Sequence, residues 1–272
     1  MKNELNYESH FAFGKNWLDY AEKIDEEKIA QAVQDLQKLN AGNTFKGKSF
    51  LDIGCGSGLH ALAAIRLGVK TVTCIDIDPN SIEATRKTLL KFSPSTPANI
   101  YIASIFDMKP ELNGQFDVVY SWGVLHHTGD MYRALEVTSK LVNPSGIFIV
   151  ALYKKTLFCG VWNKIKKWYA CTTSKNQRLA RNIRTCIQKT AYFIEGKNFK
   201  EYVANYGQWR GMNFENDLHD WMGGYPYESI SPAECSDLFM KLGFKLERSF
   251  ISRSRGFGVL GTTCDEYIFK KN

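Results

Sequence analysis

Short apolar runs alternate with helix-period segments along residues 48–152. An apolar run that stops at glycine or a polar cluster is typical of a buried parallel strand, whereas apolar residues three or four apart are typical of a helix. These patterns predict strands over 49–53, 72–77, 100–104, 116–121 and 147–152, and helices over 59–67, 79–91 and 130–141. Strands and helices in this order predict right-handed βαβ units and a parallel sheet.

The alternation ends at Tyr153, and residues 153–229 are expected to form a mostly helical insertion. Ser231, followed by Pro232 and by Glu234 three residues on, is a helix-start signature. The remaining elements that we expect are helices over 26–39 and 231–242, strands over 244–250 and 267–270, and a turn over 144–146 before the fifth strand.

The net charge of +7 is concentrated in one segment. Residues 151–201 hold 12 Lys and Arg against 2 Asp and Glu, a net charge of +10, whereas the rest of the chain is close to neutral. A basic run can be a solvated helix face, but this one also carries aromatic side chains, which suits an anionic substrate or a membrane surface.

Seven cysteines without paired spacing favour a reducing compartment. The N-terminus has no apolar signal-peptide region, and no apolar run approaches the ~20 residues of a membrane span. These features together predict a cytoplasmic protein.

A glycine-rich turn, LDIGCGSG, lies between the first predicted strand and the first following helix. Gly54, Gly56 and Gly58 would let a ligand approach backbone amides at the end of an open sheet, with Asp52 just before them. Asp76 ends the second predicted strand, where a carboxylate can accept hydrogen bonds from both hydroxyls of a ribose. The G-x-G-x-G spacing differs from the G-x-G-x-x-G of dinucleotide-binding loops.

These residues, with CIDIDP and FDVVYSWGVLHH, resemble the class I S-adenosylmethionine (SAM)-dependent methyltransferases over about residues 48–152. The resemblance implies a Rossmann-like α/β fold with a mostly parallel seven-stranded sheet, helices on both faces and SAM as cofactor. It also implies that a set of residues holds the cofactor: Asp52, Gly54, Gly56 and Gly58 at the methionine end, Asp76 at the ribose, Ile77, Ser104 and Ile105 at the adenine, and Ser121 and Trp17 in the same pocket.

On this basis we divide the chain into four parts. They are an N-terminal helical lid (1–47), a SAM-binding core (48–152), a basic aromatic cap insertion (153–229) and a C-terminal helix with an antiparallel strand pair that completes the core (230–272). The stretches 11–17 and 219–232 resemble a poorly characterised bacterial branch described as similar to quinol-type O-methyltransferases.

Two adjacent histidines, His126 and His127, follow the fourth predicted strand. The quinol-type enzymes carry a Glu-x-x-Glu-His pattern associated with a divalent cation, and the aligned positions here are Gly123, His126 and His127. Because both carboxylates are missing and hard cations prefer oxygen ligands, we predict no metal. His126 is expected to pack the loop, and His127 is a candidate general base that faces the substrate.

The insertion offers a second group of candidates. His219 is a second possible base, and Arg210 is a possible clamp for an anion or carboxylate. The same patch, with Asp217 and Asp220, also fits a capped helix end with a buried tryptophan, so both interpretations stay open.

The favoured function is methyl transfer from SAM to a small-molecule or lipid-linked acceptor, at oxygen. One alternative is an RNA or protein methyltransferase that uses the basic segment, although the chain lacks an Asn-Pro-Pro-Tyr-like tetrad after strand four, so nucleic acid is not favoured. A second is a non-catalytic nucleoside-binding module. A third, an NAD-dependent oxidoreductase, is disfavoured by the glycine spacing.

Overall fold

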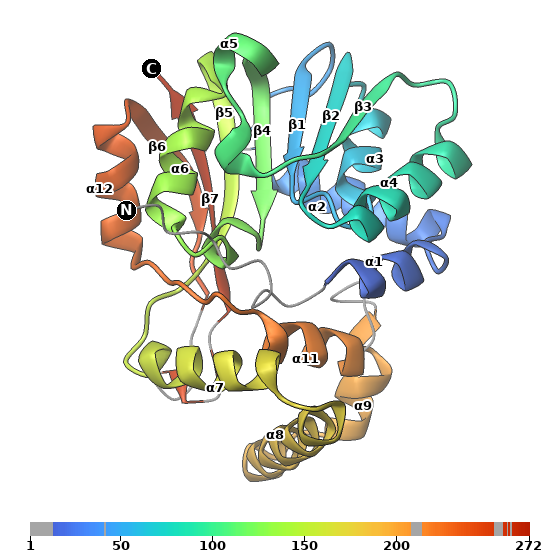
Figure 1. The fold of residues 1–272 in the computed structure, drawn as a ribbon, viewed down its shortest axis with the longest axis vertical. Helices are drawn as coiled ribbons and strands as arrows, with labels where there is room; N and C mark the ends of the chain where they lie inside the picture. The colour runs from blue at the N-terminus through green and yellow to red at the C-terminus, as the bar shows by residue number, and fades with distance from the viewer. Residues whose placement is uncertain (1–12, 41, 208–213, 253–257, 260, 262) are drawn as a thin grey trace. The chain divides into compact units, whose positions relative to one another are not determined.

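The structure is a computed structural model that describes residues 13–40, 42–207, 214–252, 258–259, 261 and 263–272 (Figure 1). The chain divides into two compact units, which are described separately. One contains the described residues within 12–156, 228–253 and 262–272, and the other contains those within 157–227 and 254–261. We call them the sheet unit and the helical unit.

The sheet unit is built on seven strands in the order β3-β2-β1-β4-β5-β7-β6. The first five strands pair in parallel, and β7 pairs antiparallel with both of its neighbours, as the resemblance implies. The strands are β1 (Ser49–Ile53), β2 (Thr71–Asp76), β3 (Ala98–Ile102), β4 (Phe116–Trp122), β5 (Val142–Tyr153), β6 (Phe244–Phe250) and β7 (Cys264–Lys271). This is the predicted α/β, Rossmann-like arrangement.

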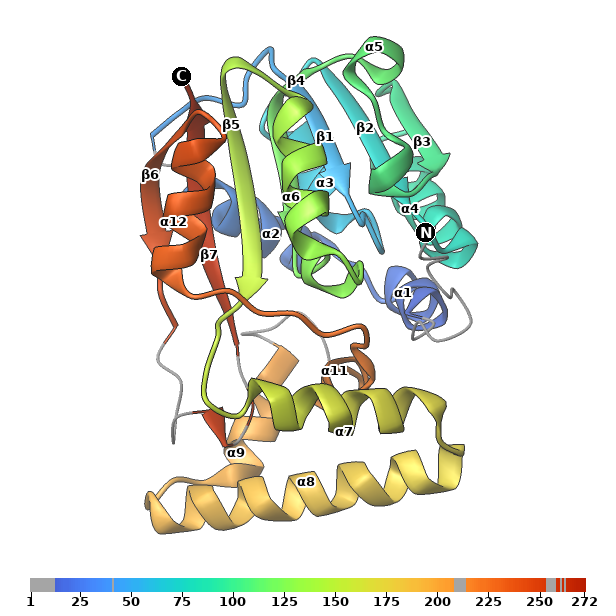
Figure 2. The ribbon, with the colours of Figure 1, turned by 60° about the vertical axis from the view of Figure 1, so that its left-hand side comes forward.

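Helices cover both faces of this sheet (Figures 1 and 2). One hydrophobic core packs α2, α3 and α4 against the sheet, and a second packs α6 and α12 against the other face. The helices of this unit are α1 (Gly14–Ala21), α2 (Glu26–Leu39), α3 (Leu59–Arg66), α4 (Pro79–Phe92), α5 (Pro110–Asn113), α6 (Met131–Lys140) and α12 (Pro232–Lys241), with the 3-10 turns η2 (Ile105–Asp107) and η3 (Leu125–His127).

Local signals explain where these helices begin. The side chain of Asp25 accepts a hydrogen bond from the Lys28 N–H at the start of α2, and Asp78 caps α4 just before a proline. Ser231 and Glu234 form a reciprocal capping box at α12, as the sequence predicts.

Several predicted boundaries differ from those of the structure; the last strand, for example, begins at Cys264 and not at residue 267. Residues 144–146 do not form a turn before the fifth strand, because β5 already begins at Val142 and continues through them. Ser145 has a φ of 60°, and the pairing with β4 shifts in register between Phe116 and Val118, so this irregularity is a bulge within the strand. The third strand is 98–102 and not 100–104, because its register is set by backbone pairing with β2.

The described residues of the helical unit are mostly helical, as the sequence predicts. Its elements are α7 (Cys159–Cys171), α8 (Ser174–Ile194), α9 (Phe199–Ala204) and α11 (Phe214–Gly223). Trp162 and Tyr169 of α7 and Leu218 and Met222 of α11 are buried in its interior. Within the described part of the chain, no helix combines the length and apolarity needed to cross a bilayer.

Candidate functional site

The glycine-rich turn joins the carboxyl end of β1 to the start of α3. Gly54, Gly56 and Gly58 all adopt positive φ angles, of 73°, 53° and 75°, which side chains rarely adopt. The backbone N–H of Gly54 donates to the carbonyl of Ile75 at 2.8 Å, which holds the turn against the end of β2. The three glycines therefore form a tight loop at the carboxyl edge of the sheet. Their N–H groups all donate to acceptors within the protein, those of Gly54 and Gly58 to carbonyls and that of Gly56 to Asp76.

Two neighbouring side chains lie directly against this loop. A Cβ atom on Gly54 would stand 2.4 Å from a methyl of Val124, and one on Gly56 would stand 3.1 Å from the indole ring of Trp17. The loop is thus in contact with the segment after β4 on one side and with α1 on the other.

Asp76 ends β2 beside the loop. Its Oδ2 accepts a hydrogen bond from the Gly56 N–H at 3.2 Å, and its Oδ1 accepts one from the Asp78 N–H at 2.9 Å. Burial raises the pKa of Asp76, and these two hydrogen bonds act in the opposite direction. The side chain of Ser81 also hydrogen-bonds to Asp76. Because a carboxylate offers about four acceptor positions, part of its capacity remains for a ligand.

Asp52 lies in β1 beneath the loop and is buried. Burial, and then the charge of Asp76, raises the pKa of Asp52 to about 7. Among the described residues, the Oδ2 atom of Asp52 has no hydrogen-bond partner. Since buried polar atoms are normally paired, this oxygen is suited to a donor supplied by a ligand.

Helix α1 links the loop to the histidine turn. Trp17 packs on Gly56, and the ring of Phe13 lies 5.8 Å from the ring of His127. The helix is fixed to α4 by a hydrogen bond of 2.9 Å from the Gly14 N–H to Oδ2 of Asp78. Residues of the predicted N-terminal lid thus contact both parts of the candidate site, although residues 1–12 of that lid lie outside the described residues.

The other predicted cofactor residues have different environments. Ile77 directly follows β2 and is 46% exposed, so its side chain is available to a ligand. Ser104 caps η2 by accepting from the Phe106 N–H, and Ile105 is buried in a hydrophobic core. Ser121 is fully buried and donates to the carbonyl of Ile53 at 3.2 Å, so its hydroxyl stabilises the strand below the loop.

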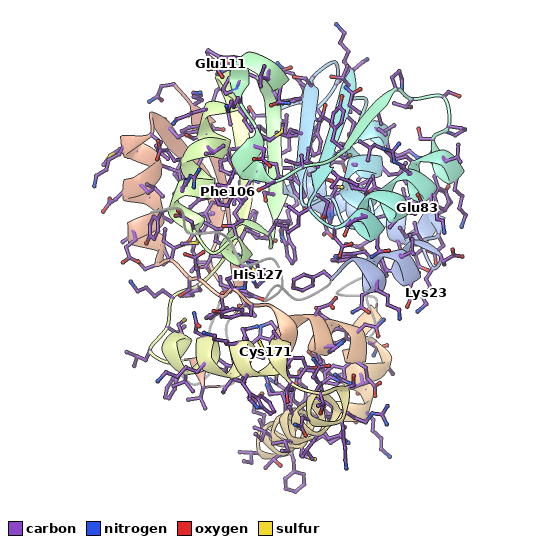
Figure 3. All side chains as sticks on the ribbon, in the orientation of Figure 1. Lys23, Glu83, Phe106, Glu111, His127 and Cys171 are labelled. Carbon is purple, nitrogen blue, oxygen red and sulfur yellow. The ribbon has the colours of Figure 1, made fainter. Side chains whose placement is uncertain are left out.

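The two adjacent histidines lie in η3 and differ in burial. His126 is fully buried, and its Nδ1 accepts a hydrogen bond from the Tyr153 N–H at 3.3 Å. His127 is half-buried, with its ring 5.4 Å from that of Tyr153, and Figure 3 shows it at the carboxyl edge of the parallel strands. The ring of His126 is therefore packed within the fold, whereas the ring of His127 remains partly accessible.

Glu228 is a residue that sequence reasoning did not single out. Its Oε2 accepts from the Met131 N–H at 2.9 Å, and its own N–H donates to the carbonyl of His126 at 3.0 Å. Burial raises the pKa of Glu228. This residue braces the histidine turn from almost a hundred positions away, and no local sequence pattern marks it.

His219 lies on α11 of the helical unit. Its Nδ1 is 2.6 Å from the hydroxyl of Tyr169 and 2.9 Å from a guanidinium nitrogen of Arg181. Burial, and then the charge of Arg181, lowers the pKa of His219 to about 4, which makes it a weak base. Arg210, the other candidate of this part of the chain, lies outside the described residues.

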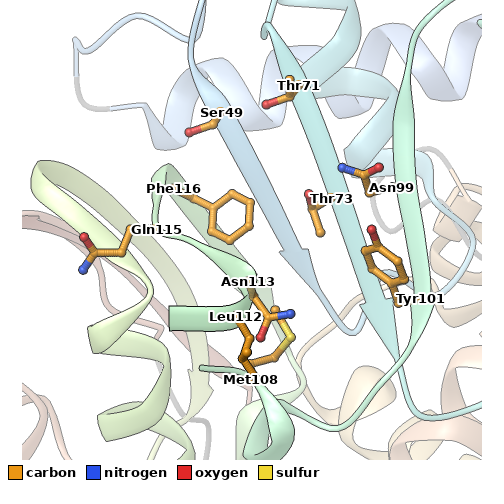
Figure 4. A pocket seen from close by; sticks show the side chains of 10 residues that line it. All are labelled: Ser49, Thr71, Thr73, Asn99, Tyr101, Met108, Leu112, Asn113, Gln115 and Phe116. Atoms are coloured by element: carbon orange, nitrogen blue, oxygen red, sulfur yellow. The ribbon is translucent and has the colours of Figure 1, made fainter. Parts of the chain in front are cut away.

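A cavity of about 310 Å³ opens elsewhere in the sheet unit (Figure 4). It lies towards the amino ends of the strands, away from the glycine loop, and its lining is formed by Ser49, Thr71, Thr73, Asn99, Tyr101, Met108, Leu112, Asn113, Gln115 and Phe116. The described residues contain no cluster of three or more His, Cys, Asp or Glu side chains arranged to hold a metal ion.

Comparisons with known proteins agree with this geometry. Residues 51–148 match the family model of a methyltransferase domain. A ribosomal protein L11 methyltransferase from Tolumonas auensis is 32% identical over 125 residues, which are 46% of this chain and 40% of that protein. A ubiquinone biosynthesis O-methyltransferase from Brucella ovis is 33% identical over 118 residues, 43% of this chain and 46% of that protein. The chain thus spans less than half the length of either relative.

Solved structures show the same fold at low sequence identity. A magnesium protoporphyrin IX methyltransferase from Synechocystis, with bound S-adenosylhomocysteine (SAH), has a TM-score of 0.54 and 15% identity. The match covers 90% of this chain and 84% of that one. PKMT2 from Rickettsia typhi, in complex with AdoHcy, has a TM-score of 0.59 and 16% identity, and the match covers 89% and 52%. Residues 51–148 therefore match a methyltransferase domain, and the chain has the fold of solved methyltransferases that were crystallised with SAH or AdoHcy.

Proposed function

We propose that the protein transfers a methyl group from SAM to the oxygen of a small-molecule or lipid-linked acceptor. The observation that carries the proposal is the pair of acids around the glycine loop. Asp52 has a buried oxygen without a hydrogen-bond partner among the described residues, and Asp76 has acceptor positions left beside Gly56. A ligand with an ammonium group and a ribose diol would match both.

The residues in and around the loop can be assigned to the methionine, ribose and adenine parts of SAM. Asp52 and the glycine loop would bind the methionine end, with the ammonium group as the donor for Oδ2 of Asp52. Asp76 would accept hydrogen bonds from the two ribose hydroxyls, and the exposed side chain of Ile77 would pack on the adenine. Ser104 and Ile105 follow β3, so they would lie along the adenine edge, where backbone groups can bind it.

SAM supplies an activated methyl group, so the residues of the chain mainly position the acceptor and exclude water. Trp17 and Phe13, both held by α1, would cover the loop and the histidine turn. His127 would accept the proton of an acceptor hydroxyl, since a neutral imidazole can act as a general base near neutral pH. We further propose that residues 1–47 and 153–229 act as the predicted lid and cap.

Oxygen is favoured as the methylated atom by the likeness to the ubiquinone biosynthesis O-methyltransferase and by the accessible imidazole of His127. The likeness to the ribosomal protein L11 methyltransferase, which covers a similar share of the chain, supports a protein acceptor as the second candidate. A small-molecule acceptor and a protein acceptor would give methylated products of different size.

Calorimetric titration with SAM, SAH and NAD is the test of cofactor binding. We expect SAM and SAH to bind, NAD not to bind, and Asp76→Ala to abolish binding, while Asp237→Ala on the exposed side of α12 has no effect. Binding of NAD alone, or of none of the three ligands, would refute the proposal. Incubation with labelled SAM and either phenolic small molecules or a cell extract, followed by separation by size, then distinguishes a small acceptor from a protein.

A further inference from the structure

Helix α8 packs its polar side against the rest of the helical unit and exposes its apolar side, which is the reverse of the usual orientation of a surface helix. Surface helices normally bury their apolar side and expose their polar side. None of the side chains of α8 is fully buried, and its half-buried side is mainly polar and basic. The residues on that side are Gln177, Ala180, Arg181, Arg184, Thr185, Gln188, Ala191 and Tyr192.

Specific contacts hold this polar side against the rest of the helical unit. Gln177 donates to the carbonyl of Tyr169 at 2.9 Å, and Arg181 contacts the hydroxyl of Tyr169 and the ring of His219. The guanidinium of Arg184 lies 5.6 Å from the ring centroid of Trp221. These contacts fix the rotation of α8 about its axis, so the opposite side is presented outwards.

That outward side carries an apolar stripe. Leu179, Ile183 and Ile187 follow one another at intervals of four residues, so they lie along one side of the helix. They are 58%, 53% and 47% exposed. Phe193 and Ile194 extend the apolar surface at the C-terminal end and are also exposed.

Basic side chains lie along one edge of the stripe. Lys175, Arg178 and Lys189 are exposed on α8, and the helix contains no acidic residue. A second copy of this chain seated on the stripe would bring two helices with only positive charges together, which is unfavourable. An anionic surface with an apolar interior matches both the charge and the stripe.

We propose that α8 lies flat on an anionic lipid bilayer, with Leu179, Ile183 and Ile187 inserted among the acyl chains and the basic side chains at the headgroups. A helix of 21 residues is ~31 Å long, enough for a lengthwise contact with the interface. An exposed apolar stripe beside lysine and arginine is the pattern of helices that lie in the interfacial plane. The inference goes beyond methyl transfer and does not depend on it.

The test is flotation of the whole protein with vesicles of phosphatidylcholine alone or mixed with phosphatidylglycerol. We expect binding to the mixed vesicles that weakens as salt is raised. The triple variant Leu179→Gln/Ile183→Gln/Ile187→Gln should bind at least about tenfold more weakly. Lys175→Gln/Arg178→Gln/Lys189→Gln should lose the preference for the anionic lipid.

A matched control places the same change at exposed apolar residues of the sheet unit. Leu90→Gln/Leu112→Gln/Met240→Gln alters side chains that are 72%, 77% and 66% exposed and should bind vesicles as the unaltered protein does. Because all the replaced side chains are exposed, both triple variants should keep the thermal unfolding midpoint. SAH affinity is measured separately on each variant. A loss of cofactor binding can then be distinguished from a loss of lipid binding.

Three outcomes would overturn the proposal. They are an absence of binding to the anionic vesicles at low salt, equal binding of the stripe variant and the unaltered protein, and equal binding of the stripe variant and the control. Sedimentation of the unaltered protein as a dimer that the stripe variant cannot form would instead assign the stripe to a second copy.

Discussion

The backbone N–H of Gly56 donates a hydrogen bond of 3.2 Å to Oδ2 of Asp76. This contact joins the glycine loop, which follows β1, to the acid that ends β2. The carboxylate that is proposed to bind the ribose therefore also holds the loop that is proposed to bind the methionine end. A change at Asp76 is expected to affect both parts of the site.

Replacement of Asp76 tests this coupling. Asp76→Ala removes the acceptor for Gly56 and for a ribose diol, and we expect SAH affinity to fall by at least about 100-fold, since each hydrogen bond to a charged group contributes ~1.5–3 kcal/mol. Asp76→Asn keeps one acceptor oxygen and should lose less. Calorimetry with SAH measures both variants. Equal affinity of D76A and the unaltered protein would show that Asp76 does not bind the cofactor.

A steric prediction concerns Gly54. An added methyl group meets Val124 and also imposes a side chain on a φ of 73°, so we expect Gly54→Ala to lower the free energy of unfolding by ~2–4 kcal/mol. Gly47→Ala is the matched control, because φ there is 75° but no atom lies within 4 Å of the added methyl. It should cost only ~1–2 kcal/mol.

The companion variant Gly54→Ala/Val124→Ala removes the two methyl groups of Val124 that the new side chain meets. We expect it to be more stable than the sum of the two single changes predicts. Urea unfolding measures the free energy of unfolding of Gly54→Ala, Val124→Ala, the double variant and the control. Additive effects of the two changes would mean that the backbone conformation alone, and not the contact with Val124, requires glycine.

Much of this architecture follows from local sequence signals. The ranges of α2 and β6 and the capping box of α12 agree with the predictions, because each depends on neighbouring residues in the chain. Asp76 was expected at the end of the second strand for the same reason. The contacts of Trp17 with Gly56 and of Glu228 with the histidine turn join distant segments, so no spacing rule could predict them.

The outward apolar side of α8 also escapes prediction from sequence. Its pattern of apolar and basic residues predicts an amphipathic helix, and such patterns normally indicate that the apolar side is buried. The opposite orientation results from partners on other helices, chiefly Tyr169 and His219, which contact Arg181. The bulge in β5 is a similar case, because residues 143–146 continue the strand between the pairs Phe116–Val142 and Val118–Ile147 where the local sequence indicates a turn.

Asp52 is expected to make stability and cofactor binding depend on pH. Its folded pKa of about 7 lies above the ordinary value of ~3.9, so the folded protein binds a proton that the unfolded chain has lost between these two pH values. The free energy of unfolding should therefore fall as pH rises from ~4 to ~7. Asp52→Asn should remove this contribution, which urea unfolding across that range would measure.

Cofactor binding should reverse this shift. If the ammonium group of SAH pairs with Asp52, its pKa falls, and binding at about pH 6 releases a proton. Calorimetry in two buffers of different ionisation enthalpy measures that proton. Asp52→Asn is the control and should release less. The same proton release from D52N and the unaltered protein would assign it to another group.

The two histidines of η3 are predicted to respond differently to replacement. His126→Ala removes a fully buried ring that accepts from the Tyr153 N–H, so we expect a loss of stability of ~2–3 kcal/mol. His127→Ala should cost ~1 kcal/mol or less and leave SAH affinity unchanged. Methyl transfer by H127A should nevertheless fall by about 100-fold or more. Unchanged transfer would exclude His127 as the base.

A final prediction concerns His219. Burial and Arg181 hold the pKa of His219 at about 4, below the ordinary value of ~6.5, so between these pH values the unfolded chain binds a proton that the folded protein does not. Stability from this group is therefore lost as pH falls from ~6.5 to ~4. Arg181→Gln removes the nearby positive charge and should raise the pKa of His219, whereas Arg178→Gln, on the exposed side of α8, should not. NMR titration of the imidazole resonances distinguishes the two variants. An unchanged pKa of His219 in R181Q would mean that burial alone keeps the imidazole neutral, and that Arg181 serves only to hold the polar side of α8 against Tyr169.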